Sequence, residues 1–127
     1  MRRFAHYSGL VALIGLVGCV TPSIPIPPPD PSQMDFEITS DPGTPTHATF
    51  TYPPDKNYEG GTAYVFNDNT GGGVFHIVNA DFSIGPLTLG AALGDQIVVT
   101  IESAQQSVSR CVVLRQGSQD PNTYCTN

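Results

Sequence analysis

The sequence predicts an all-β chain that folds as a single antiparallel β-sandwich of about seven strands. Apolar residues alternate with polar ones at a period of two, and turn-forming clusters interrupt this pattern about every ten residues. After the N-terminal stretch, no segment has a helical period. The chain has 127 residues, a length that suits one folded domain, and the sandwich is expected over residues 34–127.

The alternation and the turn clusters place the individual strands. Because proline has no N–H for a ladder, the segment that contains Gly85-Pro86 is expected at a sheet edge or a bulge. The tail from Gln116 is expected to be a polar loop as far as Cys125. The expected strands are 34–39, 47–52, 62–66, 74–78, 82–89, 97–102 and 108–114.

The first eighteen residues are typical of a signal peptide. Arg2 and Arg3 form a short basic region, and residues 8–17 are small or apolar without a charge. This apolar stretch is too short for a transmembrane helix, which needs about 20 residues. The sequence therefore predicts that residues 1–18 direct export and are removed.

The stretch Leu16-Val17-Gly18-Cys19 resembles the bacterial lipobox, which has an aliphatic residue three before a cysteine and a small residue just before it. The resemblance implies that the Cys19 thiol carries diacylglycerol and begins the mature chain. Lipoproteins with aspartate after this cysteine often stay at the inner membrane, and here the position is Val20. The resemblance therefore implies an exported protein anchored in the outer membrane, if the cell has one.

Residues 19–33 are expected to tether the sandwich to the lipid. Prolines recur through this stretch, which excludes a helix and favours extended polyproline II. At about 3.1 Å per residue, the part after the cysteine would span roughly 40 Å. A proline-rich ligand for another protein is the alternative, and a plain spacer is the favoured interpretation. The prolines are at positions 22, 25, 27, 28, 29 and 31.

The acidic composition excludes some partners. The full chain carries a net charge of −6, from five basic and eleven acidic residues. Removal of Arg2 and Arg3 leaves three basic residues, so the mature protein would carry 3 − 11 = −8. Nucleic acids and anionic lipid headgroups both need clustered Lys and Arg, so neither is an expected partner.

Residues 80–84 are followed by Leu87 and Leu89, and an alternating Val/Thr strand comes after Gly94-Asp95. In these features, part of the domain resembles bacterial immunoglobulin-like repeats. The family's glycine and serine between the aspartate and the phenylalanine are missing here. The resemblance implies an immunoglobulin-like sandwich and brings no active site with it, because a fold does not specify a function.

The remaining two cysteines are expected to form a disulfide. With Cys19 assigned to the lipid, Cys111 and Cys125 are an even pair in an exported protein. Closure of a loop of about 15 residues should stabilise the fold by about 3 kcal/mol. A redox or metal role is the alternative, which the wide spacing disfavours.

Few residues suggest chemistry. Oxygen ligands in Asn67-Asp68-Asn69 could hold Ca²⁺, but a turn explains the same residues and is favoured. His47 is expected on the outer face of its strand, and His76 as a hydrogen-bonded structural residue. No nucleophile elbow, zinc helix or phosphate loop is present, and no cofactor is expected.

The composition and motifs favour a non-catalytic envelope module for binding or structure. An accessory subunit of an envelope complex, which would pair through an exposed strand edge, is one alternative. A small envelope enzyme is another. Tyr52, Tyr58 and Tyr64 are candidate exposed contact residues, although Tyr52 and Tyr64 suit the core equally well.

Overall fold

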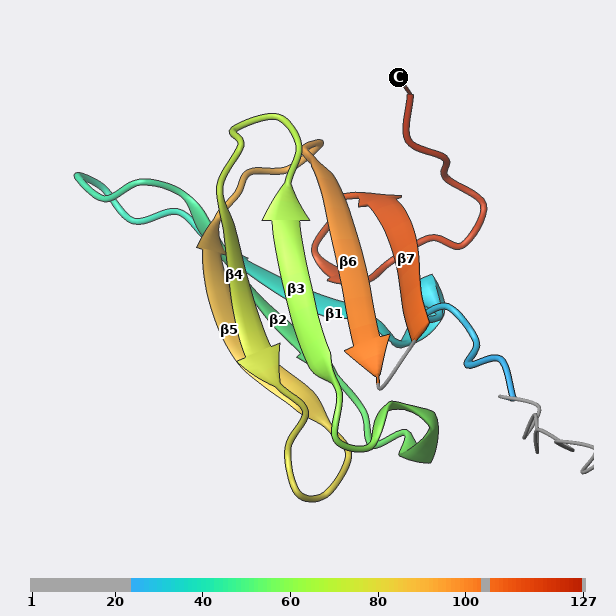
Figure 1. Cartoon of the computed structure of the whole chain (residues 1–127). Coiled ribbons are helices and arrows are strands. Elements are labelled where there is room, and N and C mark those ends of the chain that lie inside the picture. The colour runs from blue at the N-terminus through green and yellow to red at the C-terminus, as the bar shows by residue number, and fades with distance from the viewer. Residues whose placement is uncertain (1–23, 104–105, 127) are drawn as a thin grey trace, which may run out of the picture.

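Two antiparallel sheets of four strands each pack face to face in the computed structural model (Figure 1). The structure describes residues 24–103 and 106–126. The predicted all-β sandwich is confirmed, with eight strands instead of about seven. The strands are β1 (Asp35–Thr39), β2 (His47–Tyr52), β3 (Thr62–Asn67), β4 (Gly73–Ile77), β5 (Ile84–Gly90), β6 (Gln96–Ser103), β7 (Gln106–Val113) and β8 (Gly117–Ser118).

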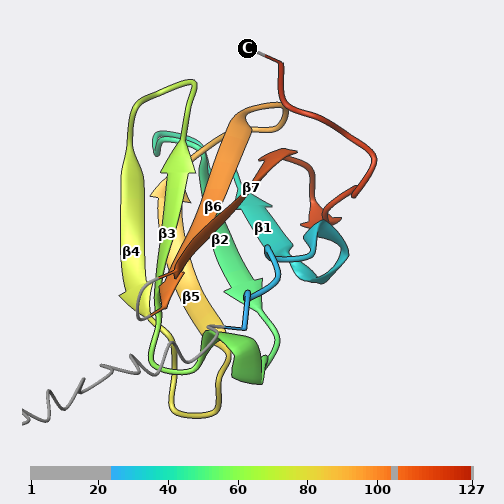
Figure 2. The same ribbon diagram turned by 45° about the vertical axis from the view of Figure 1, so that its right-hand side comes forward.

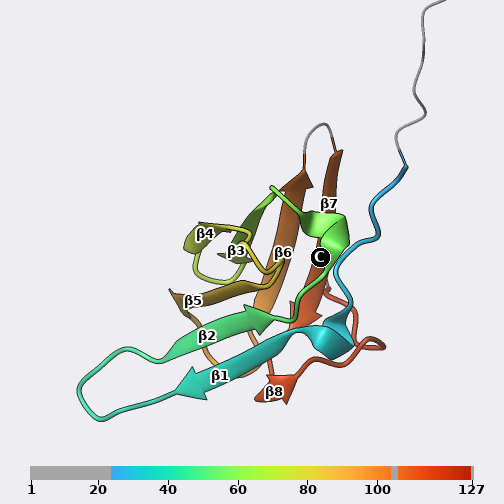
Figure 3. The same ribbon diagram turned by 90° about the horizontal axis from the view of Figure 1, so that it is seen from below.

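Strands that follow one another in the chain are divided between the two sheets. One sheet has the order β5-β2-β1-β8 and the other β4-β3-β6-β7. Seen from below, the two sheets form separate layers, and the loop between β1 and β2 extends from one end (Figure 3). The strand with Gly85-Pro86 is an edge strand as predicted, and its pairing with β2 shifts register between Phe50 and Tyr52.

The period-two alternation explains which side chains form the core. In β3, Ala63 and Val65 are fully buried, while Tyr64 and Phe66 point outward. The inward residues of both sheets meet in one cluster of eighteen buried apolar residues. Within it, the rings of Phe36 and Phe50 lie 4.9 Å apart between centroids. Burial of this apolar surface is what holds the two sheets together.

The eighth strand lies in the tail that the sequence predicts as loop. Gly117 and Ser118 pair with the start of β1, and Gln119 is fully buried behind them. The Gln119 amide donates to the carbonyl of Arg115 and accepts from its N–H. This pairing satisfies the buried amide, and a two-residue strand is too short to show a period in sequence.

Residues 24–33, here called the N-terminal strap, lie against the sandwich and not away from it (Figures 2 and 3). The N–H of Ile26 donates to the Gln106 side chain at 2.8 Å. The Tyr58 hydroxyl donates to the carbonyl of Pro27 at 2.8 Å. This part of the expected tether is therefore hydrogen-bonded to the sandwich through both backbone donors and backbone acceptors.

The end of the strap is a short 3-10 helix, η1 (Pro31–Gln33). The side chain of Asp30 accepts from Ser32, which caps the helix, and Pro31 is buried. The N–H of Asp30 donates to the Tyr52 hydroxyl. The packed unit therefore begins ahead of residue 34, where the sequence places the domain boundary.

Candidate interaction surface

Large apolar side chains remain exposed on the outer face of β3 and β4. Phe75 is 69% exposed and Ile77 66%, and Tyr64 and Phe66 beside them are also exposed. Tyr64 and Phe75 are direct partners in the strand pairing, with ring centroids 6.1 Å apart. We call these four residues the β3–β4 face. Contiguous exposed apolar patches of this kind mark interaction sites more often than isolated exposed residues do.

A shallow apolar groove lies within this face. It encloses about 200 Å³ and is lined by residues 64–66 and 73–75. The floor is open because Gly73 has no side chain, and a Cβ there would stand 3.2 Å from the Phe66 ring. Glycine at this position therefore creates a hollow between Phe66 and Phe75, with Ile77 two residues further along the same face.

The β3–β4 face has no charged side chain of its own, and one acidic residue lies beside it. No residue of β4 carries a carboxylate, ammonium or guanidinium group. Glu102 lies opposite Thr62 on β6, and its negative charge raises the pKa of the Tyr64 hydroxyl. Apart from Glu102 beside Tyr64, the face therefore offers apolar side chains and no ionic group of β4.

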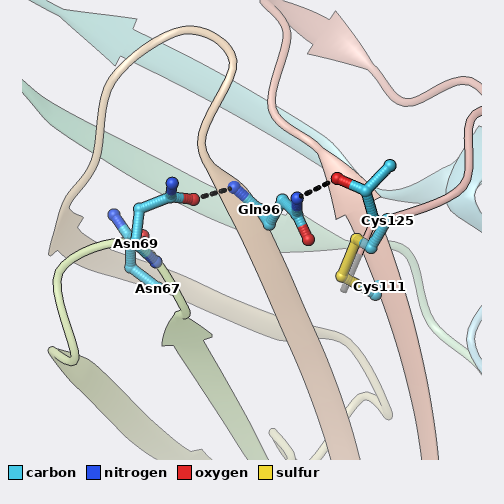
Figure 4. Close-up of a disulfide and its surroundings, with 6 residues drawn as sticks. Asn67, Asn69, Gln96, Cys111 and Cys125 are labelled. Carbon is cyan, nitrogen blue, oxygen red and sulfur yellow. Dashed lines mark hydrogen bonds between the residues drawn. A yellow bond between two sulfur atoms is a disulfide. The ribbon is translucent and has the colours of Figure 1, made fainter.

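The proposed calcium residues act as a structural cross-link at the end of β3 (Figure 4). Asn67 is fully buried, and its amide donates to the carbonyl of Gly90 at 3.0 Å and to the carboxylate of Asp95 at 2.8 Å. Its oxygen accepts from the N–H of Asn69, whose own side-chain oxygen accepts from Gln96. These oxygens are thus engaged with backbone donors, as the turn interpretation requires.

Asp68, the third residue of the calcium candidate, is exposed at the tip of this turn. In the part of the chain that the structure describes, no three His, Cys, Asp or Glu side chains come close enough to hold a metal ion.

The predicted disulfide between Cys111 and Cys125 is present. The two Cα atoms lie 5.9 Å apart, and the bond joins β7 to the tail that follows β8. Beside it, the Gln96 amide donates to the Thr126 hydroxyl (Figure 4). The tail is therefore fixed to the outer side of the β6–β7 sheet, near the Asn67 turn.

The tyrosines and histidines divide between core and surface. Tyr64 is exposed, as a contact residue must be, while Tyr52 and Tyr58 are buried with ring centroids 5.9 Å apart. The expectation that Tyr58 is exposed is wrong, because the 3-10 helix η2 (Lys56–Tyr58) turns its ring inward. Burial raises the pKa of both buried tyrosines. His76 is hydrogen-bonded to Asn79 at 2.9 Å, as predicted for a structural histidine.

His47 is half-buried at the start of β2, where a ring nitrogen lies 3.4 Å from the carbonyl of Pro45. Cys19, the predicted lipid attachment site, lies outside the described residues. Among the described residues, no helix has the length and apolar character needed to cross a membrane.

The sequence did not single out Phe66, Phe75 or Ile77. Their alternation with Val65, Val74 and Val78 does place them on the side away from the core, so the signal was present. An alternating strand shows that one face is buried, but either face of Val-Phe-His-Ile is apolar enough to be the buried one. Comparison with protein-family models, with curated proteins and with solved structures found no match to this chain.

Proposed function

We propose that the chain is an exported, lipid-anchored envelope protein whose sandwich is a non-catalytic interaction module. The observation that carries the proposal is the β3–β4 face, where four large apolar side chains remain in contact with solvent. Exposure of so much apolar surface is unfavourable unless another surface covers it. The face lies on rigid paired strands, which suits a binding surface that needs little ordering when it is occupied.

The proposed location rests on two features of the chain. The disulfide between Cys111 and Cys125 supports an oxidising compartment, such as the bacterial periplasm. The lipobox resemblance at Leu16-Val17-Gly18-Cys19 supports anchoring through Cys19. With Val20 after the cysteine, we propose the outer membrane as the location if the cell has one.

The position of the strap adds a geometric consequence to the proposed anchor. Only residues 20–23 separate Cys19 from the first described residue, Ile24. Five extended residue steps span at most about 18 Å. An anchored sandwich would therefore stay within about 20 Å of the lipid surface, about half the distance that a free tether allows.

Intact mass spectrometry of the mature protein, extracted from membranes, tests the anchor. We expect a chain that begins at Cys19 with added acyl mass, and a shift of about two daltons on reduction of the disulfide. A soluble, unlipidated product that starts elsewhere would contradict the proposed anchor and location.

Site-specific photo-crosslinking in whole cells tests the binding role of the face. A photoreactive phenylalanine analogue replaces Phe75 in the full chain, and the control carries it at Leu93, which is 72% exposed in the loop between β5 and β6. We expect a defined adduct from position 75 that is absent from position 93. Equal labelling from both positions, or none from position 75, would contradict an interaction role for this face.

A further inference from the structure

Three of the four sheet edges are closed to another strand. The edge strand β5 contains Pro86, which cannot donate to a ladder, and β8 has only two residues. The edge strand β7 carries Arg110, which pairs with core-facing Val99 and so places a charge on the inner side of that edge. The Gln106 side chain of β7 is also occupied by the strap. These are the usual protections of an exposed edge.

The fourth edge strand, β4, has none of these protections. It is five residues long and contains no proline and no charged residue. At one end of β4, the N–H of Val78 donates to the carbonyl of Gly61, which directly precedes β3. At the other end, the carbonyl of Gly72 accepts from the N–H of Asn67. In an antiparallel ladder alternate residues point both backbone groups at the partner strand. Residues 73, 75 and 77 therefore point their N–H and C=O groups away from β3.

The free edge and the β3–β4 face thus share the same three residues. Their side chains lie on the outer face beside Tyr64 and Phe66, while their backbone groups face sideways. The size of the exposed side chain changes along these three residues. Gly73 is the open floor of the groove, Phe75 is the middle residue, and Ile77 is the exposed end.

We propose that a second copy of this chain occupies this surface, through antiparallel pairing of β4 with β4 about a two-fold axis at Phe75. The inference rests on the proposed binding role of the face and names its partner. An axis at the middle residue places Ile77 of each copy opposite Gly73 of the other. Ile77 then enters the hollow between Phe66 and Phe75 that the glycine leaves, so the surface is complementary to itself, as a two-fold interface requires.

The backbone groups agree with this register. The pairs 73 with 77, 75 with 75 and 77 with 73 are those whose free N–H and C=O groups face each other across the axis. Each such pair exchanges two hydrogen bonds, with Cα atoms about 5.5 Å apart. The two Phe75 rings meet on the same face, where paired aromatic side chains stabilise a sheet. The result is one continuous eight-stranded sheet.

Charge repulsion between copies does not oppose pairing at this edge. Each mature copy carries an excess of acids, so two copies repel each other wherever their acidic surfaces meet. The β4 seam is uncharged, and the nearest acid described above, Glu102, lies two strands away on β6. A seam of one short strand is smaller than a standard interface, so we expect a dissociation constant in the micromolar range or weaker.

Antiparallel pairing also fixes how two anchored copies would lie. Gln106, which holds the start of the strap, is at the same end of the sandwich as Ile77. The two straps then leave the joint sheet at opposite ends. With both lipid anchors in one bilayer, the strands would run parallel to the membrane plane.

Disulfide trapping in membranes tests the register with the full chain. Phe75→Cys places two thiols at about 5.5 Å between Cα atoms, within the range of a disulfide. We expect a covalent dimer on mild oxidation, whereas Leu93→Cys and the unsubstituted chain stay monomeric. Adding Ile77→Lys to Phe75→Cys should lower the dimer yield by at least about fivefold, because a lysine replaces the side chain that fills the groove. Adding Leu93→Lys should leave the yield unchanged.

Sedimentation of the unsubstituted protein in mild detergent is the second measurement, since it needs no change at Phe75. We expect a concentration-dependent dimer that Ile77→Lys abolishes and Leu93→Lys retains. A monomer at all concentrations, or trapping that is equal at positions 75 and 93, would overturn the inference. If the photoreactive residue at position 75 instead captures a different protein or lipid, the binding role stands and the self-pairing is overturned. If position 75 gives no adduct at all, both fall.

Discussion

Replacement of Asn67 by alanine tests the cross-link that joins the two sheets at one end of the sandwich. The side chain is fully buried and makes three hydrogen bonds. One reaches Gly90 on β5 of the opposite sheet, one reaches Asp95 before β6, and one closes the turn at Asn69. Asn67→Ala removes all three and leaves the half-buried Asp95 without this partner.

The expected loss is large relative to the stability of a small domain. The two bonds to backbone groups contribute about 1 kcal/mol each, and the bond to the Asp95 carboxylate about 2 kcal/mol. Their sum is about 4 kcal/mol, against a total unfolding free energy of roughly 5–15 kcal/mol for a domain. With an m-value near 1.5 kcal/mol per molar urea, the unfolding midpoint should fall by roughly 2.5 M.

Urea unfolding followed by tyrosine fluorescence measures this shift. Asn69→Ala is the matched control, because it lies in the same turn but is exposed and gives up one acceptor, to the N–H of Gln96. We expect Asn69→Ala to cost about 1 kcal/mol. Equal midpoints for the two variants would refute the reasoning, since they would show that the buried bonds of Asn67 contribute no more than an exposed one.

The same samples separate the turn from the calcium interpretation. If residues 67–69 form only a turn, about 5 mM Ca²⁺ should leave the midpoint of the unsubstituted chain unchanged. A calcium-dependent rise that disappears in Asp68→Asn would restore the calcium interpretation, because that variant removes the one carboxylate of the turn.

Three further predictions follow from the structure. Serine at both Cys111 and Cys125 should lower the unfolding free energy by about 3 kcal/mol in urea titrations, and a loss under about 1 kcal/mol would show that the tail is held by other contacts. Hydrogen bonds from the Ser83 side chain and N–H lower the pKa of Asp81. The ionised carboxylate therefore stabilises the fold above the ordinary pKa of 3.8, and this stabilisation is lost as the pH falls below that value. Asp81→Asn should therefore flatten the fall in stability between roughly pH 5 and pH 2, and parallel pH profiles would contradict this. Tyr58→Phe removes the donor to Pro27, so it should cost about 1–2 kcal/mol and speed proteolysis within the strap, and unchanged cleavage would show that the strap is held without it.

The positions of seven strands were predictable from sequence, and so was the edge location of the one that contains Pro86. They follow from local signals, namely a period of two and turn residues, which act over a few positions. The short β8 was not predictable, since two residues cannot show a period and Gly117 pairs with β1 more than eighty residues earlier in the chain. For the candidate surface, the outward direction of the side chains was predictable from sequence, but their exposure to solvent was not. The alternation separates Phe75 and Ile77 from the core residues, but only the sandwich shows that nothing covers them.

The sequence by itself determined the class of the fold, the turns and the Cys111–Cys125 pairing, and it predicts the Cys19 anchor. These depend on residue type and spacing along the chain, which one sequence displays in full. Only the tertiary structure decided that the strap docks on Tyr52 and Tyr58 and that β4 is the unprotected edge. Both depend on which segments distant in sequence become neighbours, and the hydrogen-bonding groups that a strand leaves free are fixed only once its partner is known.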